Sequence, residues 1–538
     1  MIAGLVLVAM VSGGGADAAA RQAHEHPGSD AVDFPISCSA AAQAEFNRGV
    51  ALLHHMTYPR ARESFERVAA LDARCAMAHW GIAMTLFQPL WPTRPGPDAL
   101  RRGWEAVQQA RALELPTARE RLLVDAAAAF FRDPASADYW ARIRGWAAAM
   151  AKAHETFPKD DEISAFDALA ILASAPPESA ADASARAAAL LYPIYERHPD
   201  HPGALHYLVH ANDTHGREHE LPDVVRKYET IAPRNPHALH MPTHIYTRLG
   251  EWDAVIRGNL LAADAALEQP AGDRGQYVWD EFPHAIEYLV YAYLQEGDDA
   301  RAAAQLKRLH ETARLEPTLK TAFHLASTSA RYALERRAWR EASQLTPREP
   351  ASLSWDQFPW PEAVTWFARA LGAVHEGQME NARRAIDRLQ ALEDRAAGAG
   401  EDVFTRNIRV LRLEASAWAD HAAGRAASAV ALMRQAAALE ASTPKPPVTP
   451  GPTLPAEELL GDLFMEHKQP AEALAAYTRS LEQYPKRFNS LLGAARAARA
   501  SNDAATARRF YQELLETAVN GTRQAPLDEA RAFLSAAR

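Results

Sequence analysis

The most regular stretch of the chain is residues 461–485, which read GDLFMEHKQPAEALAAYTRSLEQYP. Small residues and one aromatic residue recur in it at helical spacing, with a proline at the end: Gly461, Ala473, Tyr477 and Pro485. Apolar residues three and four apart form one face of an α-helix. The stretch therefore predicts two short helices, each with one apolar face to bury.

The same spacing returns along most of the chain. Near its start, Gly49 is followed by Ala61, Phe65 and Ala69, and Asp72 closes the unit. Further turns between paired helices are predicted at Gly250, Gly297, Trp339, Gly377 and Gly424, and another unit begins at Leu491. This is the pattern of tetratricopeptide repeats, and no strand-like alternation competes with it. The predicted fold is all-α, an α-solenoid of tetratricopeptide-like (TPR-like) helix pairs.

Prolines divide this array. Six of them fall in residues 443–455, which favours an extended linker. We therefore expect an N-terminal TPR-like array over 36–340, further helical repeats over 341–442, and a separable C-terminal TPR pair over 456–538. A second proline-rich loop, residues 88–97, contains Trp91 and is expected to cover one end or edge of the array.

Composition excludes several classes of function. The chain has 538 residues, is 48% hydrophobic and contains no apolar run long enough to span a membrane. Its net charge is −10, and Lys and Arg are scattered, so the basic patch expected of a nucleic-acid binder is missing. We expect neither a membrane span nor a nucleic-acid partner.

The first twenty residues favour export. An apolar stretch over 2–11 precedes the small residues 16–20, as in a signal peptide, although no basic residue comes before it. Residues 1–20 are thus a predicted signal peptide, and the location is predicted to be periplasmic or secreted. The two cysteines, Cys38 and Cys75, fall near the starts of first helices in successive repeats, which is compatible with a disulfide and equally with two buried thiols.

Histidine is the residue with the most informative spacing. Nine of the 21 histidines fall between His198 and His244. His206 and His210 are four residues apart, as are His240 and His244, so each pair shares one helix face. The two pairs are 34 residues apart, which is one tetratricopeptide period. The repeat therefore places all four side chains in register.

Further residues of metal-binding type belong to the same predicted face. When each repeat is counted from the turns at Gly250 and Gly297, these further residues fall on the first helices of three successive repeats. In TPR proteins generally, those helix positions line the concave groove. These residues are His237, His284, Glu287 and Asp213. We expect them to act as additional ligands or as partners that fix the imidazole tautomers. The loop histidines His198 and His201 are expected to cap helices.

Imidazoles with a few carboxylates suit a transition metal. Zinc or copper is favoured and iron is also compatible, whereas calcium and magnesium prefer oxygen ligands. One or two ions could be shared between adjacent repeats, since packed helices lie about 8–10 Å apart. Two alternatives compete: a metal-free polar groove for a peptide or small anion, and histidines without a shared role.

Other functions remain open from the sequence alone. TPR solenoids commonly bind a protein or peptide partner in their grooves, and residues 456–538 are the favoured place for one. A metal-dependent hydrolase or oxidase is a third hypothesis. Tyr207 follows His206 where zinc metallopeptidases carry a general-base Glu, so that mechanism has no base at its usual place. Catalytic residues are not identified.

Four sequence blocks resemble a group of exported bacterial tetratricopeptide-repeat proteins. They are CAMAHWGIAM at 75–84, HPGALHYLVH at 201–210, HALHMPTHIYTRLG at 237–250 and YLVYAYLQ at 288–295. The resemblance covers residues 36–310, and the C-terminal third resembles only generic repeats. It implies the solenoid fold and a bacterial, exported protein. The group has no settled biochemical role, so the resemblance implies no activity.

Overall fold

The computed structural model describes residues 32–91, 94–135, 138–272 and 275–536, so the predicted signal peptide lies outside the described residues. The first part of the chain forms α2 (Ala40–His54), α3 (Tyr58–Leu71), α4 (Ala76–Met84), α5 (Pro97–Ala112), α6 (Ala118–Phe131), α7 (Tyr139–Thr156), α8 (Asp161–Ser174), η2 (Pro177–Ser179), α9 (Ala180–Arg197), α10 (Pro202–Asn212), η3 (Glu218–Glu220), α11 (Pro222–Ile231), α12 (Pro236–His240), α13 (Pro242–Leu249) and α14 (Trp252–Leu267). A two-residue hairpin, β1 (Pro270–Ala271) and β2 (Tyr277–Val278), then precedes α15 (Glu281–Gln295).

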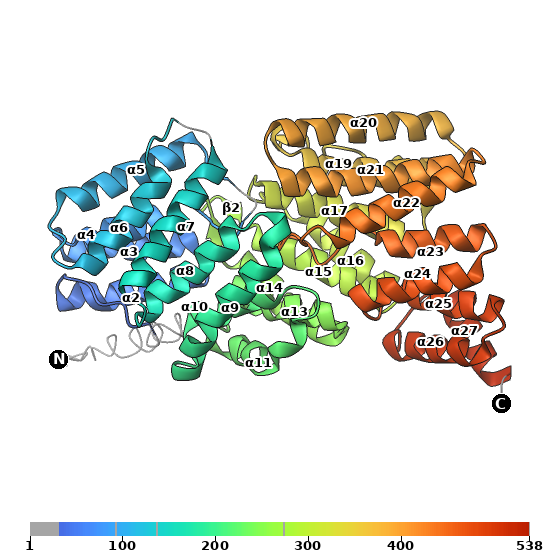
Figure 1. Ribbon diagram of the computed structural model, residues 1–538, viewed down its shortest axis with the longest axis horizontal. Helices are drawn as coiled ribbons and strands as arrows, with labels where there is room; N and C mark the ends of the chain where they lie inside the picture. Colours follow the sequence, from blue (N-terminus) through green and yellow to red (C-terminus); the bar gives the residue numbers. More distant parts are fainter. Residues whose placement is uncertain (1–31, 92–93, 136–137, 273–274, 537–538) are drawn as a thin grey trace, which may run out of the picture.

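The second part of the chain is also helical. It comprises α16 (Asp299–Glu311), α17 (Leu319–Glu335), α18 (Trp339–Gln344), η4 (Trp355–Gln357), α19 (Pro359–His375), α20 (Met379–Gly398), α21 (Asp402–Ala422), α22 (Ala426–Ala441), α23 (Ala456–Glu466), α24 (Pro470–Gln483), α25 (Phe488–Ala500), α26 (Ala504–Thr517) and α27 (Gln524–Ala536). Helices that follow one another in the chain pack side by side along most of the array (Figure 1). The predicted all-α, TPR-like solenoid is confirmed.

The recurring small and aromatic residues are explained by packing between helices. A Cβ atom on Gly461 would lie 2.7 Å from the ring of Tyr477, and one on Gly493 would lie 2.4 Å from it. Gly49 and Gly81 stand in the same relation to Phe65. Each aromatic ring thus lies against two helices that approach closely only because a glycine offers no side chain.

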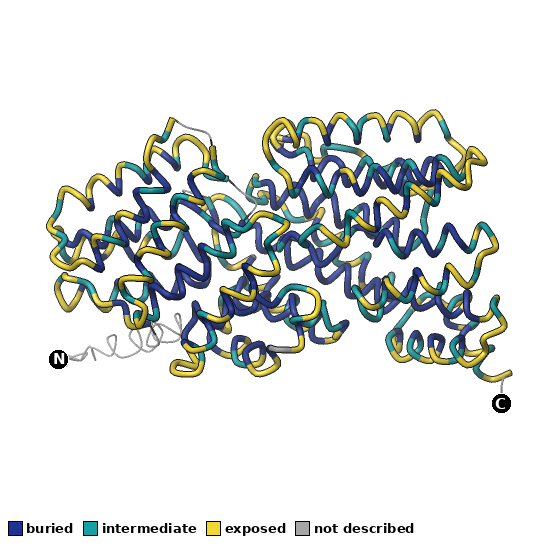
Figure 2. The backbone as a smooth tube through the Cα atoms, in the orientation of Figure 1, coloured by how far each residue is buried: buried dark blue, intermediate teal, exposed yellow. Residues whose placement is uncertain are grey.

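Buried apolar side chains form two cores, one from Val32 to Ile245 and one from Leu239 to Ala530. The two cores meet at α12 and α13, whose side chains contribute to both. Residues 236–245 at this junction are all buried, as is much of the neighbouring helices (Figure 2). Polar side chains at the junction are therefore enclosed by apolar layers on both sides.

The first helix of the His237–Gly250 repeat is interrupted. It ends at His240 and resumes at Pro242, because proline has no N–H to donate to the preceding turn. Met241 nevertheless keeps helical angles, with φ −53° and ψ −43°. The four-residue spacing of His240 and His244 therefore still places both rings on one face.

Residues 443–455, named the proline strap here, are not the free linker that their prolines favour. The segment is non-helical, as expected, but it runs to the middle of the molecule between α22 and α23 (Figure 1). Lys445 pairs with Asp213 at 2.8 Å, and Arg331 donates to the carbonyl oxygens of Gly451 and Pro452 at 3.0 and 2.7 Å. Because prolines leave carbonyl groups without helical partners, a buried arginine can hold the strap from α17.

The C-terminal unit is likewise joined to the rest of the chain. Arg487, fully buried just before α25, bonds to Glu335 of α17 at 2.8 Å and to Glu458 of α23 at 3.0 Å. Its other amine donates to the hydroxyl of Tyr291 on α15 at 3.1 Å. Residues 456–538 therefore share a buried polar network with the central repeats, which a separable module would not do.

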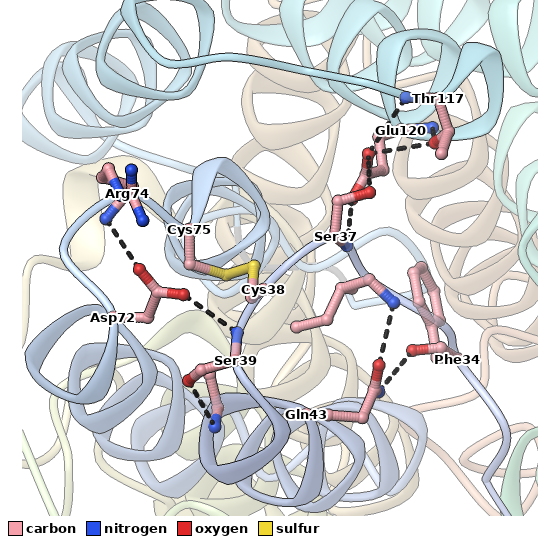
Figure 3. The surroundings of a disulfide bond; sticks show 12 residues. Phe34, Ser37, Cys38, Ser39, Gln43, Asp72, Arg74, Cys75, Thr117 and Glu120 are labelled. Atoms are coloured by element: carbon pink, nitrogen blue, oxygen red, sulfur yellow. Dashed lines mark hydrogen bonds between the residues drawn. A yellow bond between two sulfur atoms is a disulfide. The ribbon is translucent and has the colours of Figure 1, made fainter.

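At the N-terminal end, Cys38 and Cys75 form a disulfide, with Cα atoms 5.2 Å apart (Figure 3). Beside the disulfide, the side chain of Ser39 caps the start of α2. The backbone N–H of Ser39 donates to the carboxylate of Asp72, which follows the end of α3. The bridge stabilises the first helix pair by about 3–4 kcal/mol in a chain-entropy account.

Among the described residues, no helix combines the length and apolar character needed to cross a bilayer.

Candidate metal centre

Six histidines converge at the junction of the two cores. They come from α10, α12, α13 and α15 and form two groups of three, in each of which the candidate ligand atoms lie within 4.8 Å of one another. The N-terminal triad is His206, His210 and His237, and the C-terminal triad is His240, His244 and His284. All six are among the metal ligands predicted from the sequence.

In both triads, Nε2 atoms of neighbouring rings face each other. Nε2 of His206 lies 3.1 Å from Nε2 of His210 and 3.1 Å from Nε2 of His237. In the C-terminal triad, the Nε2 atoms of His240 and His244 are 2.9 Å apart, and the ring centroids of His240 and His284 are 4.2 Å apart. The triads are neighbours, with 6.1 Å between the ring centroids of His210 and His244.

The other ring nitrogen, Nδ1, is held from outside in five of the six histidines. In the N-terminal triad, Nδ1 of His206 donates to the carbonyl oxygen of His54 at 2.5 Å, and Nδ1 of His237 donates to Glu281 at 3.2 Å. A carbonyl and a carboxylate only accept. Both rings therefore carry their proton on Nδ1 and present an unprotonated Nε2 to the triad.

The C-terminal triad repeats this arrangement. Nδ1 of His244 donates to Asp213 at 2.8 Å, and Nδ1 of His240 donates to the side-chain oxygen of Asn259 at 2.7 Å. The amide nitrogen of Asn259 donates in turn to the carbonyl oxygen of Val255, which fixes the orientation of the amide. The Nε2 atoms of His240 and His244 are therefore also unprotonated and inward.

Asp213 and Glu287 lie outside the two triads. Asp213 holds Nδ1 of His244, and Glu287 accepts from Nδ1 of His324 on α17 at 2.5 Å. Nε2 of His324 then accepts from Nδ1 of His284 at 3.1 Å. Both carboxylates thus orient histidines, one directly and one through His324, so the structure gives them the orienting role and brings neither into a triad.

Burial controls the charge of the cluster. It lowers the pKa of all six histidines, to about 3 for His210, and is the largest cause in each case. Burial alone would raise the pKa of Asp213, but Lys445 and Arg248 hold it well below its usual range. At neutral pH the rings are therefore neutral and Asp213 is ionised.

Neutral rings with inward Nε2 lone pairs leave an electrostatic problem in the absence of a cation. In two contacts, His206 with His237 and His240 with His244, both Nε2 atoms lack a proton, so lone pairs about 3 Å apart face each other with no hydrogen between them. Buried polar atoms without partners are costly. A metal ion bound at about 2.0–2.1 Å would hold neighbouring ligand nitrogens roughly 3.3 Å apart. The observed separations of 2.9–3.1 Å need to widen by only a few tenths of an ångström. The donor set fits a transition metal.

A third group, His54, Glu162 and His201, looks similar but differs in the direction of its protons. His201 caps α10, as predicted, by accepting the N–H of Ala204 on Nδ1, so its Nε2 carries a proton and donates to Glu162 at 3.2 Å. Nε2 of His54 lies 2.8 Å from the same carboxylate. Every close contact is a satisfied hydrogen bond, and this group is structural.

The two triads are covered rather than open to the groove. His206, His240 and His244 are at most 2% exposed, and two loops lie beside the cluster. The cover is formed by Leu90 and Trp91 of the predicted covering loop and by Pro447 and Val448 of the proline strap, around a cavity of about 30 Å³. The prediction that these positions line a concave groove is corrected to a groove filled by the chain itself.

Several residues that lie beside the triads were not predicted from the sequence. His324 precedes the positive-φ turn at Arg337 by the same interval as His284 precedes Gly297 and His237 precedes Gly250. The repeat count could therefore have identified His324, had Arg337 been recognised as the equivalent of the glycines. Glu281, Asn259, Lys320 and the strap residues carried no sequence signal, since only folding brings them to the cluster.

No protein-family model matches the chain, and no curated protein matches it. Solved structures with some likeness include the APC/C hetero-tetramer Cut9-Hcn1, with 14% identity over 92% of this chain and 90% of that chain and a TM-score of 0.32. Two structures of the human IFIT1 dimer, with m7Gppp-AAAA and with PPP-AAAA, both show 13% identity and a TM-score of 0.38. They cover 82% and 92% of this chain, and 90% and 94% of those chains. These distant likenesses say nothing about the function of this protein.

Proposed function

We propose that the protein is an exported TPR-like solenoid that binds transition metal, one or two ions per chain, through its central histidines. One observation carries the proposal: acceptors bind Nδ1 of four histidines, so that their unprotonated Nε2 atoms face each other in two pairs. His206 faces His237 at 3.1 Å, and His240 faces His244 at 2.9 Å. The outer acceptors also fix ring orientation, as partners of metal-bound histidines do. Zinc, copper and iron all suit imidazole ligands.

The Cys38–Cys75 disulfide supports the exported location, since disulfides persist in oxidising compartments. The apolar N-terminal stretch supports it independently. A periplasmic or secreted protein would acquire metal outside the cytosol.

Metal analysis tests this proposal. Native protein purified without added metal is compared with a His210→Ala/His244→Ala variant, which removes one ligand from each triad. The matched control is His421→Ala/His467→Ala. These two histidines are half-buried, lie outside the cluster, and have ring nitrogens 3.0 Å apart. Native protein and control are expected to contain metal and the triad variant to lack it, at equal helical content by circular dichroism. Equal and negligible metal in all three would end the proposal.

A second candidate, a metal-dependent enzyme, is favoured by a cavity beside the cluster. This cavity has a volume of about 440 Å³ and reaches His210 and Asp213, with walls that include Leu172, Phe323 and Trp360. A small, largely apolar molecule could bind there next to the metal. A substrate screen with and without chelator tests this function.

The rival function, a scaffold that grips a partner peptide, needs an empty groove. The proline strap lies against the central repeats, where Arg331 binds its carbonyl oxygens and Asp213 pairs with Lys445. A partner would therefore have to bind elsewhere or displace the strap. A pull-down with the full chain, with and without metal, distinguishes a scaffold from a metal-binding protein.

A further inference from the structure

The two triads are separate ligand sets. An ion with six imidazole ligands would hold opposite nitrogens about 4.2 Å apart, twice the usual metal–nitrogen distance. Among the described residues, the histidine nitrogens meet a 4.8 Å limit only in two groups of three, and the ring centroids of His237 and His240 are 6.4 Å apart. The geometry therefore offers two three-coordinate positions side by side.

The charges around the triads already balance. Four carboxylates lie in the surrounding layer, and each is paired with a cation: Asp213 with Lys445 and Arg248, Glu281 and Asp280 with Lys320, and Glu287 with Arg331. The four cations match the four carboxylates. Burial and the neighbouring Asp280 raise the pKa of Glu316 to about 8, so this side chain adds no charge at neutral pH.

A buried site with balanced surroundings favours ions of low charge. Two divalent ions would add four uncompensated positive charges to the interior, whereas two monovalent ions add two. Because burying net charge is costly, and the ligands are all neutral, the difference is large. Among the metals that suit imidazole, copper is the one with a common monovalent state, copper(I).

The cover over the triads gives an independent argument. Catalytic zinc with three protein ligands keeps a fourth position for water. The cavity next to the triads, however, has a volume of only about 30 Å³, and Leu90, Trp91, Pro447 and Val448 form its apolar side. A cavity of this size holds only about one or two water molecules, so it leaves little room for a solvent ligand on each of two ions. A three-coordinate ion needs no such ligand.

We propose that the protein holds a pair of copper(I) ions, one in each histidine triad, beneath the cover formed by Trp91 and the proline strap. This proposal rests on the proposed metal-binding function and adds to it the metal, its oxidation state and the number of ions.

The full-length chain is titrated anaerobically with copper(I) against bicinchoninate, and separately with zinc(II) against a chromogenic zinc chelator. We expect two tightly bound copper(I) ions per chain and much weaker zinc binding. His237→Gln and His284→Gln, which each alter one triad while filling the space, are each expected to lose one of the two copper ions. The His421→Ala/His467→Ala control is expected to keep both.

The outcomes separate the two proposals. Two tightly bound zinc ions with no competitive copper(I) binding would overturn the copper(I) assignment and leave the metal-binding function standing. A single copper ion that either variant abolishes would overturn the pair. Absence of both metals from a folded wild-type chain would overturn the metal-binding function itself.

Discussion

At the scale of single residues, the candidate site depends on which nitrogen of each histidine carries the proton. The structural group of His54, Glu162 and His201 and the two triads are all buried clusters of ligand-type side chains with similar distances between their ligand atoms. They differ because acceptors hold Nδ1 in the triads, whereas in the structural group the backbone N–H of Ala204 is donated to His201. Proximity of histidines alone would not have separated a metal site from a hydrogen-bonded core.

Asn259 provides a direct test of this orientation. Asn259→Leu removes the acceptor on Nδ1 of His240 while filling the same space, so the ring can rotate or change tautomer. Metal affinity is expected to fall by about 10–100-fold, as for other partners of metal-bound histidines. Competition with a chelator measures it. Asn407→Leu is the control, because Asn407 makes the same bond to the carbonyl four residues earlier and contacts no triad. Equal affinity in both variants would contradict the orienting role.

His375 offers a pH test far from the triads. Its ring stacks on Trp339 with centroids 3.9 Å apart, and burial, followed by Arg337, lowers its pKa to about 4. Between pH 6.5 and 4 the unfolded chain therefore binds a proton that the folded chain does not, and stability falls as pH falls. Above pH 6.5 the residue has no such effect.

His375→Phe keeps a stacking ring and removes the titration. Over that pH window the variant should lose less stability than the wild type, by up to about 1.4 kcal/mol per pH unit. Urea unfolding at pH 7 and pH 4.5 measures the difference. His219→Phe, an exposed position, controls for loss of a histidine. Parallel pH dependence of the wild type and the His375 variant would count against this account.

At the scale of elements, the repeat period explains what the sequence could predict. It put His206, His210, His240 and His244 in register, and all four meet although Pro242 divides their second helix. The pattern could not reveal the proline strap, because prolines state only that no helix forms there. Its burial depends on Arg331 and Asp213, which lie more than a hundred residues earlier. Register is a local property, whereas the cover of the site is a product of tertiary packing.

At the scale of the whole molecule, buried charge ties the C-terminal repeats to the centre. A solenoid of independent units would have contacts only between neighbours. Here Arg487 joins α15, α17 and α23 through Tyr291, Glu335 and Glu458. The strap that covers the triads lies between α22 and α23, so the position of the C-terminal unit and the closure of the site are mechanically linked.

Arg487→Leu tests this link. Removing the guanidinium leaves Glu335 buried without its cation and Glu458 with Arg337 alone, both carboxylates being at most 1% exposed, so stability is expected to fall by about 3–5 kcal/mol. Arg496→Leu is the matched control, since its pair with Glu529 lies on the surface and contributes no more than about 1 kcal/mol. Chemical unfolding of both variants gives the two values. If loss of Arg487 costs no more than loss of Arg496, the C-terminal repeats are an independent module. If it costs several kcal/mol and also speeds release of metal to a chelator, the buried network holds the strap over the histidines.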